Sequence, residues 1–143
     1  TPECPVHCYV VHLGLFEGGR GRQTQSLIDA VNSSAPNGEP VIIAGDFNDW
    51  RNTLSDKLRA GLGVCEVFDE LGPRSPMGDM VRGWAGRKPR LAPARTFPAM
   101  LPWFRLDRIY VRGFKVNSAQ VMHGPLWAKL SDHAPIVAEL ELA

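Results

Sequence analysis

Residues 41–50 read VIIAGDFNDW, a short apolar run followed at once by polar residues. The run is rich in β-branched residues, and the turn cluster Pro36, Asn37 and Gly38 precedes it. Such a pattern is typical of a strand that is buried on both faces of a sheet. An ionised carboxylate directly after such a strand needs water, a hydrogen-bond donor or a cation. We therefore ask which of these Asp46 meets.

The composition indicates one compact globular domain. The chain has 143 residues, 44% of them hydrophobic, and 16 basic against 15 acidic residues give a net charge of +1. This charge neither favours nor excludes a polyanionic partner. No apolar run is long enough to span a membrane, and the first residues lack a secretory signal pattern. We expect a cytoplasmic protein whose native amino terminus is absent from this sequence.

The cysteines Cys4, Cys8 and Cys65 form an odd set without the pair spacing of a zinc site. Cys4 and Cys8 lie in a segment that reads as extended chain, which holds their Cα atoms too far apart for a disulfide. We expect reduced, structural thiols, as is usual in chains that are not secreted.

The first half of the chain alternates between strand and helix patterns. Residues 6–13 and 41–44 predict strands, and residues 22–34 predict a helix between them with one apolar face. This order predicts a right-handed crossover between two parallel strands. A short helix is expected from Trp50 to a glycine stop at Gly61, and further helical turns over residues 64–71.

The second half is expected to be richer in strands. Residues 72–95 read as a long loop rich in Gly, Pro and Arg. Residues 105–113, 114–124 and 134–142 then alternate with period two, which predicts half-buried strands. The expected fold class is α/β with a mixed sheet.

Four stretches place polar residues at the tips of predicted strands: VVHLG, AGDFND, FRLDRI and LSDHAP. The first two follow their strands, at the edge where α/β sheets bind ligands. The other two precede their strands, so they reach that edge only if those strands run the opposite way. Together they predict a metal-assisted hydrolytic site made of His12, Asp46, Asn48, Asp107, Asp132 and His133.

Each candidate has a structural alternative when it is taken alone. His12 fits a satisfied core or edge histidine, and Asp46 and Asp49 fit caps of the following helix. Asp107 lies between two arginines and fits a surface ion pair. Ser131 fits the opening of a turn. Only the combination of these residues indicates a site.

Four motifs occur in a fixed order: HL at 12–13, GDFN at 45–48, LDRI at 106–109 and SDHAPI at 131–136. They resemble the signature of the endonuclease/exonuclease/phosphatase superfamily, which has a deoxyribonuclease-I-like α/β sandwich. That superfamily includes deoxyribonucleases, apurinic-site endonucleases, sphingomyelinases and inositol polyphosphate phosphatases. The resemblance runs from about residue 6 to residue 141, and is strongest to small bacterial members that carry AGDFNDW, ARTFP and LDRIYV.

The resemblance implies a role for each catalytic candidate. Asp46 positions and deprotonates the attacking water, and Asn48 donates to phosphate oxygens. Asp107 orients His133, and this pair stabilises charge on the phosphoryl oxygens. His12 matches a second histidine near the scissile phosphate.

The resemblance also implies a divalent metal ion beside Asp132 and Asp46. Oxygen ligands of this kind suit Mg²⁺ or Mn²⁺. Members of the superfamily carry an amino-terminal half that supplies further metal ligands, an Asn and a Glu, and no counterpart precedes His12. We therefore expect residues 1–143 to be the carboxy-terminal part of one such domain, with about one mixed sheet plus helices. An uncovered sheet face predicts self-association.

The expected function is hydrolysis of a phosphodiester or phosphomonoester by metal-activated water, with little activity in this part alone. The alternative is a binding or scaffold module that keeps the fold without catalysis. Serine hydrolase chemistry through Ser131 is disfavoured because the sequence lacks a nucleophile elbow there.

The substrate stays open between nucleic acid, a phospholipid head group and a sugar phosphate. The segment 72–95 has a composition that fits a phosphate backbone, with Trp84 available to stack on a base, but it equally fits a solvated loop. Its basic residues are Arg74, Arg82, Arg87, Lys88, Arg90 and Arg95.

Overall fold

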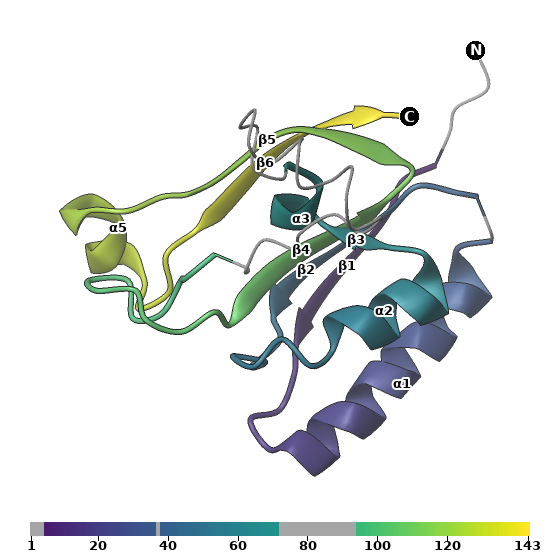
Figure 1. The fold of residues 1–143 in the computed structure, drawn as a ribbon, viewed down its shortest axis with the longest axis horizontal. Helices are drawn as coiled ribbons and strands as arrows, with labels where there is room; N and C mark the ends of the chain where they lie inside the picture. The colour runs from purple at the N-terminus through teal and green to yellow at the C-terminus, as the bar shows by residue number, and fades with distance from the viewer. Residues whose placement is uncertain (1–4, 37, 72–93) are drawn as a thin grey trace, which may run out of the picture.

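A computed structural model describes residues 5–36, 38–71 and 94–143. The elements are β1 (His7–His12), α1 (Glu17–Ser34), β2 (Val41–Asp46), α2 (Ser55–Leu62), β3 (Cys65–Glu66), α3 (Val67–Leu71), β4 (Asp107–Arg112), β5 (Phe114–Val121), α5 (Pro125–Leu130) and β6 (Ile136–Leu142). Figure 1 shows α1 and α2 side by side against the sheet that contains β1, β2 and β4. The expected α/β fold class is confirmed.

Four strands form one sheet in the order β1-β2-β4-β3. β1 and β2 are parallel, as the crossover pattern predicts, and β4 runs antiparallel to β2. In this register Asp46 lies opposite His12 on one side and Asp107 on the other. The condition for a shared edge is therefore met: β4 runs the opposite way, and its first residue lies where β1 and β2 end.

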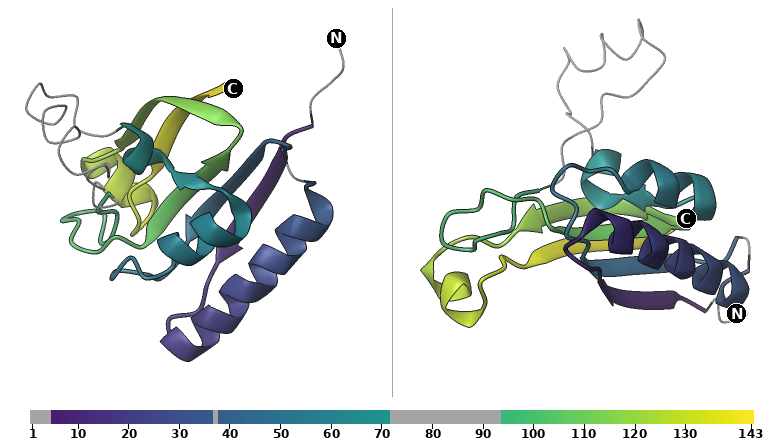
Figure 2. Two further views of the ribbon diagram at one scale, coloured as in Figure 1. Left: turned by 45° about the vertical axis from the view of Figure 1, so that its right-hand side comes forward. Right: turned by 90° about the horizontal axis from the view of Figure 1, so that it is seen from below.

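The last two strands differ from the expected single mixed sheet. β5 and β6 pair with each other in a separate two-stranded antiparallel sheet. Gly113, with a φ of 77°, is the single residue between β4 and β5, and a turn this short leads β5 away from β4. Figure 2 shows the β5–β6 pair and α5 extending beyond the four-stranded sheet.

Two cores fill the two faces of the four-stranded sheet. On the helix side, residues such as Ile43, Phe47 and Leu58 are completely buried between the sheet and α1 and α2. On the other side, Val116 of β5 packs with Val67 and Val111, and the sheet residues Ile42 and Ile109 pack partly against them. The apolar face that was expected to be bare is thus partly covered, although Val10 of β1 is 88% exposed.

Helix boundaries differ from the predicted ones at two glycine-containing segments. α1 begins at Glu17 rather than at residue 22, so a stretch with three glycines is helical. α2 continues past Gly61 and ends before Gly63, which takes the left-handed conformation of a helix stop. At Gly61 a Cβ would lie 3.0 Å from Ile28 side-chain atoms, so this glycine allows α1 and α2 to approach closely.

Two further predictions concern thiols and membrane spans. Cys8 and Cys65 are free thiols, and Cys4 lies outside the described residues. Within the described ranges, no helix is both long and apolar enough to cross a membrane.

Gly45 controls how closely β1 and β2 approach just before the candidate site. Its φ is 144°, and a Cβ built there would lie 1.9 Å from the carbonyl oxygen of Val11 in the neighbouring strand. Backbone atoms cannot move aside as a flexible side chain can. The sequence Ala-Gly-Asp therefore places a glycine at the one position where the strand ends meet without room for a side chain.

We expect Gly45→Ala to lower the free energy of unfolding by at least about 3 kcal/mol, because backbone strain and overlap add at this position. Chemical denaturation measures the change. Gly21→Ala in α1 is the matched control, since nothing lies within 4 Å of a Cβ there. The control should be neutral or more stable by about 1 kcal/mol, from helix propensity. Equal stability of Gly45→Ala and the wild type would contradict this reading of the strand contact.

Candidate active site

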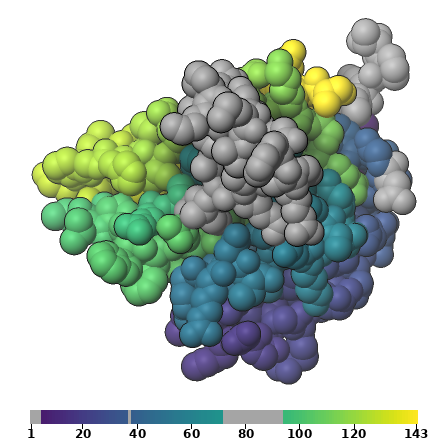
Figure 3. All heavy atoms as spheres, viewed as in Figure 1, coloured from purple at the N-terminus to yellow at the C-terminus, as the bar shows by residue number. Residues whose placement is uncertain are grey.

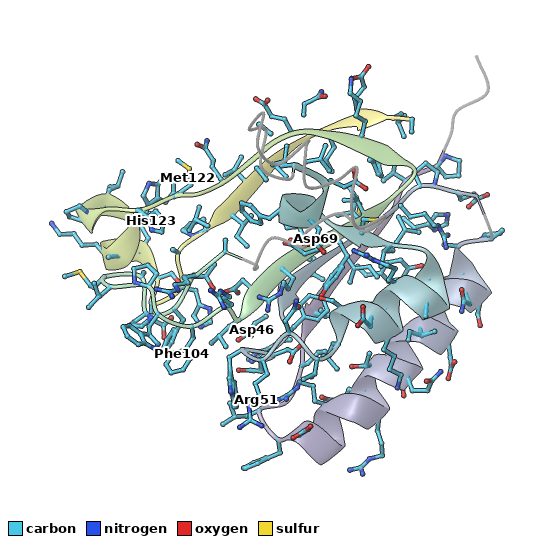
Figure 4. All side chains as sticks on the ribbon, in the orientation of Figure 1. Asp46, Arg51, Asp69, Phe104, Met122 and His123 are labelled. Atoms are coloured by element: carbon cyan, nitrogen blue, oxygen red, sulfur yellow. The ribbon has the colours of Figure 1, made fainter. Side chains whose placement is uncertain are left out.

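The candidate site lies where β1 and β2 end and β4 begins. The backbone N–H of Leu13 donates to the carbonyl oxygen of Asp46 at 2.8 Å, and the N–H of Phe47 donates to the carbonyl oxygen of Leu106 at 2.9 Å. These two bonds extend the sheet pairing just past the strands. Figure 4 labels Asp46 at this edge of the sheet. The polar residues of three motifs are thereby held on one rim.

The fourth motif reaches the same rim through a hydrogen bond between side chains. Nδ1 of His133 lies 2.8 Å from Oδ2 of Asp107, as expected from the sequence. Both side chains are partly buried, at 28% and 20% exposure. The backbone N–H of His133 also donates to the Ser131 hydroxyl oxygen. Ser131 therefore opens a turn, which is the structural role considered for it in the sequence analysis.

The turn at residues 96–104 holds the His133 segment in place. The N–H of Ala134 donates to the carbonyl oxygen of Thr96 at 2.8 Å, and the N–H of Ala99 donates to that of Asp132 at 2.7 Å. The ring of Phe97 lies 4.9 Å from the His133 ring, centroid to centroid. Completely buried Thr96 therefore joins the His133 segment to the turn that precedes β4.

The charge state of His133 follows from two opposing influences. Burial, the largest single one, lowers the pKa of His133. The hydrogen bond and charge of Asp107 raise it, and the charges of Asp46 and Asp132 add to that effect, so the pKa is raised in balance. The imidazolium form is consequently retained to higher pH than in a free histidine.

Asp46 lies between the two histidines of the rim. Its Oδ1 accepts the backbone N–H of Asn48 at 2.8 Å, which is the geometry of an Asx turn. Its Oδ2 lies 3.7 Å from Nε2 of His12. The His12 side chain is 78% exposed, so it is not a satisfied core histidine. The Asp46 carboxylate keeps an oxygen directed toward the rim.

Asn48 links the loops that follow β1 and β2. It is 8% exposed, has a φ of 49°, and donates from its amide to the carbonyl oxygen of Leu13 at 2.8 Å. A left-handed backbone favours Asn among residues with side chains. A primary amide has a second N–H, so this contact is compatible with a second acceptor. The structure thus adds a positioning role that the sequence did not suggest.

Asp49 and Arg108 are buried structural residues of the rim. The carboxylate of Asp49 accepts hydrogen bonds from the Thr53 hydroxyl and the Leu54 N–H, so it orders the loop that precedes α2. It is not the cap of α2, whose N-cap is Leu54 and has no side-chain cap hydrogen bond. Arg108 is 1% exposed and donates to the carbonyl oxygens of Arg105, Asp107 and Asp49. It ties the start of β4 to the loop after β2.

Glu66 lies near Arg108 in this buried layer. Burial raises the pKa of Glu66 to about 7, while the charge of Arg108 opposes that rise. Sequence reasoning missed Arg108 and Thr96. The period of two in β4 contained a usable signal, because it puts Arg108 on the same buried face as Tyr110.

The described residues offer only part of a divalent-metal site. Asp46 and Asp132 are carboxylates of the kind that Mg²⁺ or Mn²⁺ prefers. In the described residues, however, no group of three or more His, Cys, Asp or Glu side chains is arranged to hold a metal ion. These residues alone do not fit a complete metal site. The basic residues predicted between positions 74 and 90, and Trp84, lie outside the described ranges.

Comparison with known proteins agrees with this geometry. A profile of the Endonuclease/Exonuclease/phosphatase family matches residues 3–133. The chain is 39% identical over 137 residues to "Uncharacterized protein YbhP" of Escherichia coli strain K12. This alignment covers 96% of the chain and 47% of that protein. The chain thus spans about half the length of the curated relatives that it matches.

Two solved structures show the same fold. A mannosyl-6-phosphatase from Bacteroides thetaiotaomicron matches with a TM-score of 0.66 and 18% identity, over 94% of this chain and 51% of that one. The catalytic domain of human Nocturnin with a bound sulfate matches with a TM-score of 0.64 and 23% identity, over 94% of this chain and 46% of that one.

The chain belongs to the endonuclease/exonuclease/phosphatase family. Nucleases and phosphatases share one reaction, the hydrolysis of a phosphate ester.

We expect Asp107→Asn to lower the pKa of His133, because the substitution removes the charge that opposes burial. NMR titration of the imidazole measures this pKa. Glu139→Gln on β6 is the matched control and should leave this pKa unchanged, because the Glu139 carboxylate accepts a hydrogen bond from the Ser118 hydroxyl on β5. Since the pKa of folded His133 is raised, the stability lost in Asp107→Asn should be largest at low pH and shrink as pH rises through that pKa. An unchanged His133 pKa would contradict the pairing.

Proposed function

We propose that the full-length protein hydrolyses a phosphate ester at the rim formed by Asp46, Asn48, Asp107 and His133. The observation that carries this proposal is the hydrogen bond between Asp107 and His133, which brings the SDHAPI motif to the strand ends that hold the GDFN and LDRI motifs. The three motifs are far apart in sequence. Their meeting at one edge is what a phosphoester site requires and what a scaffold does not.

In this proposal each residue acts on a stated group. The Asp46 carboxylate accepts a proton from a water molecule whose oxygen attacks phosphorus while the ester P–O bond breaks. The His133 imidazolium, held by Asp107, donates to the phosphoryl oxygens where negative charge develops. Asn48 offers its second amide N–H, and exposed His12 lies near the leaving group.

We further propose that the reaction requires Mg²⁺ or Mn²⁺ beside Asp46 and Asp132. Two carboxylates cannot surround a cation that takes six oxygens, so the remaining ligands come from water and from parts of the protein outside the described residues. A bound divalent cation supplies charge stabilisation. We propose on the same ground that these 143 residues form the carboxy-terminal part of the domain and have little activity alone.

We expect Asp46→Ala and His133→Ala to lower turnover of the full-length protein by about 10² to 10⁴. A screen with DNA, RNA, phospholipid and phosphomonoester substrates provides the assay. A chelator should abolish activity, and Mg²⁺ or Mn²⁺ should restore it. Glu139→Gln is the control on β6. Wild-type rates in either alanine variant would refute the site, and absence of any turnover would favour a non-catalytic binding module. Turnover that needs no metal would contradict the proposed divalent ion.

We also propose that residues 1–143 self-associate when they are isolated. The motivating observation is the 88% exposure of Val10 on the sheet face opposite the helices. Burial of apolar surface favours association by about 25 cal/mol per Å². Light scattering of the isolated chain should show a dimer, and Val10→Ser should shift the equilibrium toward monomer. A monomer at high concentration would contradict the proposal. We further propose that the protein is cytoplasmic, and fractionation of cells tests this location.

A further inference from the structure

Among the described residues, one end of the molecule carries several strongly exposed apolar side chains. We call residues 98–104 and 125–130 the apolar rim. Figure 3 shows these segments, green and yellow-green, adjoining on one side of the surface. The exposed fractions are 80% for Met100, 74% for Leu101, 66% for Trp103, 65% for Leu126 and 71% for Leu130. Soluble surfaces seldom gather so many large apolar residues without a binding role.

The apolar rim is joined directly to the candidate site. Ala99 donates its N–H to the carbonyl oxygen of Asp132, and the Phe97 ring lies against His133. A hollow of about 300 Å³ lies between the two segments. It is lined by Pro98, Ala99, Met100, Ala128, Lys129 and Leu130, and ends at Ser131 and Asp132. Whatever binds the rim is therefore held next to His133.

The two segments that form the apolar rim carry basic but no acidic residues. Residues 94–104 and 122–131 contain no Asp or Glu, but they contain Arg95, His123 and Lys129. The Arg95 guanidinium lies over the Trp103 ring, 5.7 Å from its centroid. Figure 4 shows His123 and Phe104 at the same end of the molecule. The carboxylate that lines the hollow is Asp132, which belongs to the candidate site.

We propose that the apolar rim docks on the surface of a bilayer that contains anionic phospholipid. Exposed Leu and Met side chains with a Trp at their edge suit the boundary between head groups and acyl chains. Basic residues that flank them are attracted to anionic head groups. Single-stranded nucleic acid fits less well: Trp103 and Phe104 offer rings on which a base could stack, but Met100, Leu101, Leu126 and Leu130, which are all strongly exposed, do not.

Docking in this way would bring lipid phosphates beside the His133 rim. As a statement about substrate, this inference rests on the proposed function and narrows it to lipid phosphoesters. As a statement about binding, it requires no chemistry. Vesicle binding and turnover are therefore measured separately, and Asp46→Ala should bind vesicles as the wild type does.

The test is co-sedimentation of the full-length protein with vesicles of phosphatidylcholine and phosphatidylglycerol, and with vesicles of phosphatidylcholine alone. We expect binding to the first that weakens with salt, and much weaker binding to the second. Met100→Ser with Leu101→Ser should weaken binding about tenfold or more. Val137→Ser with Leu142→Ser on β6, at 44% and 53% exposure, is the matched control and should bind normally. Thermal unfolding confirms that both variants fold.

Two further measurements bear on the position of the bilayer. Lys129→Gln should reduce the preference for phosphatidylglycerol, and Trp103→Phe should remove most of the fluorescence change that vesicles cause. Equal vesicle binding by the rim variant and the β6 variant would overturn the proposal. So would an absence of vesicle binding, or a rim variant that loses only binding to a single-stranded oligonucleotide. Vesicle binding without any phosphoesterase activity would uphold docking and refute the proposed function.

Discussion

The candidate site depends on the close approach of β1 and β2 at Gly45. The carbonyl oxygen of Val11 occupies the space where a side chain would stand, so only glycine permits the pairing to continue to the strand ends. Because the pairing continues, His12, Asp46 and Asp107 fall opposite one another across three strands. Residues separated by about sixty positions in sequence thus become neighbours through backbone geometry alone.

His133 reaches this edge by a different route. It precedes β6, which belongs to the smaller sheet, so sheet pairing does not place it beside Asp107. Backbone bonds from Thr96 and Ala99 place it instead. The turn at 96–104 consequently has two roles, since its inner side fixes the histidine while its outer side carries exposed Leu101 and Trp103. Any surface that contacts this turn therefore lies close to the Asp107–His133 pair.

The sequence was sufficient for the parallel crossover and the strand ends, because hydrophobic period is a local signal. The pairing of Asp107 with His133 was implied by the resemblance of the motifs to a family, not by any local pattern. The sequence was insufficient for the separate β5–β6 sheet, since a single glycine turn decides between pairing with β4 and leaving it. The role of Thr96 was hidden for a similar reason: its contacts are backbone bonds to distant residues, which no local pattern records. Arg108 is intermediate, because its strand period pointed inward while its charge suggested the surface.

The charges around His133 bear on the proposed cation. Three carboxylates, those of Asp46, Asp107 and Asp132, act on this one histidine. Even with the imidazolium fully charged, Asp46, Asp107, Asp132 and His133 together carry more negative than positive charge. A phosphate ester is itself an anion, and two like charges about 4 Å apart repel by roughly 4 kcal/mol at an effective dielectric constant of about 20. Binding of such a substrate to these residues is therefore unfavourable unless additional positive charge is present, and this requirement supports the proposal of a divalent ion between Asp46 and Asp132.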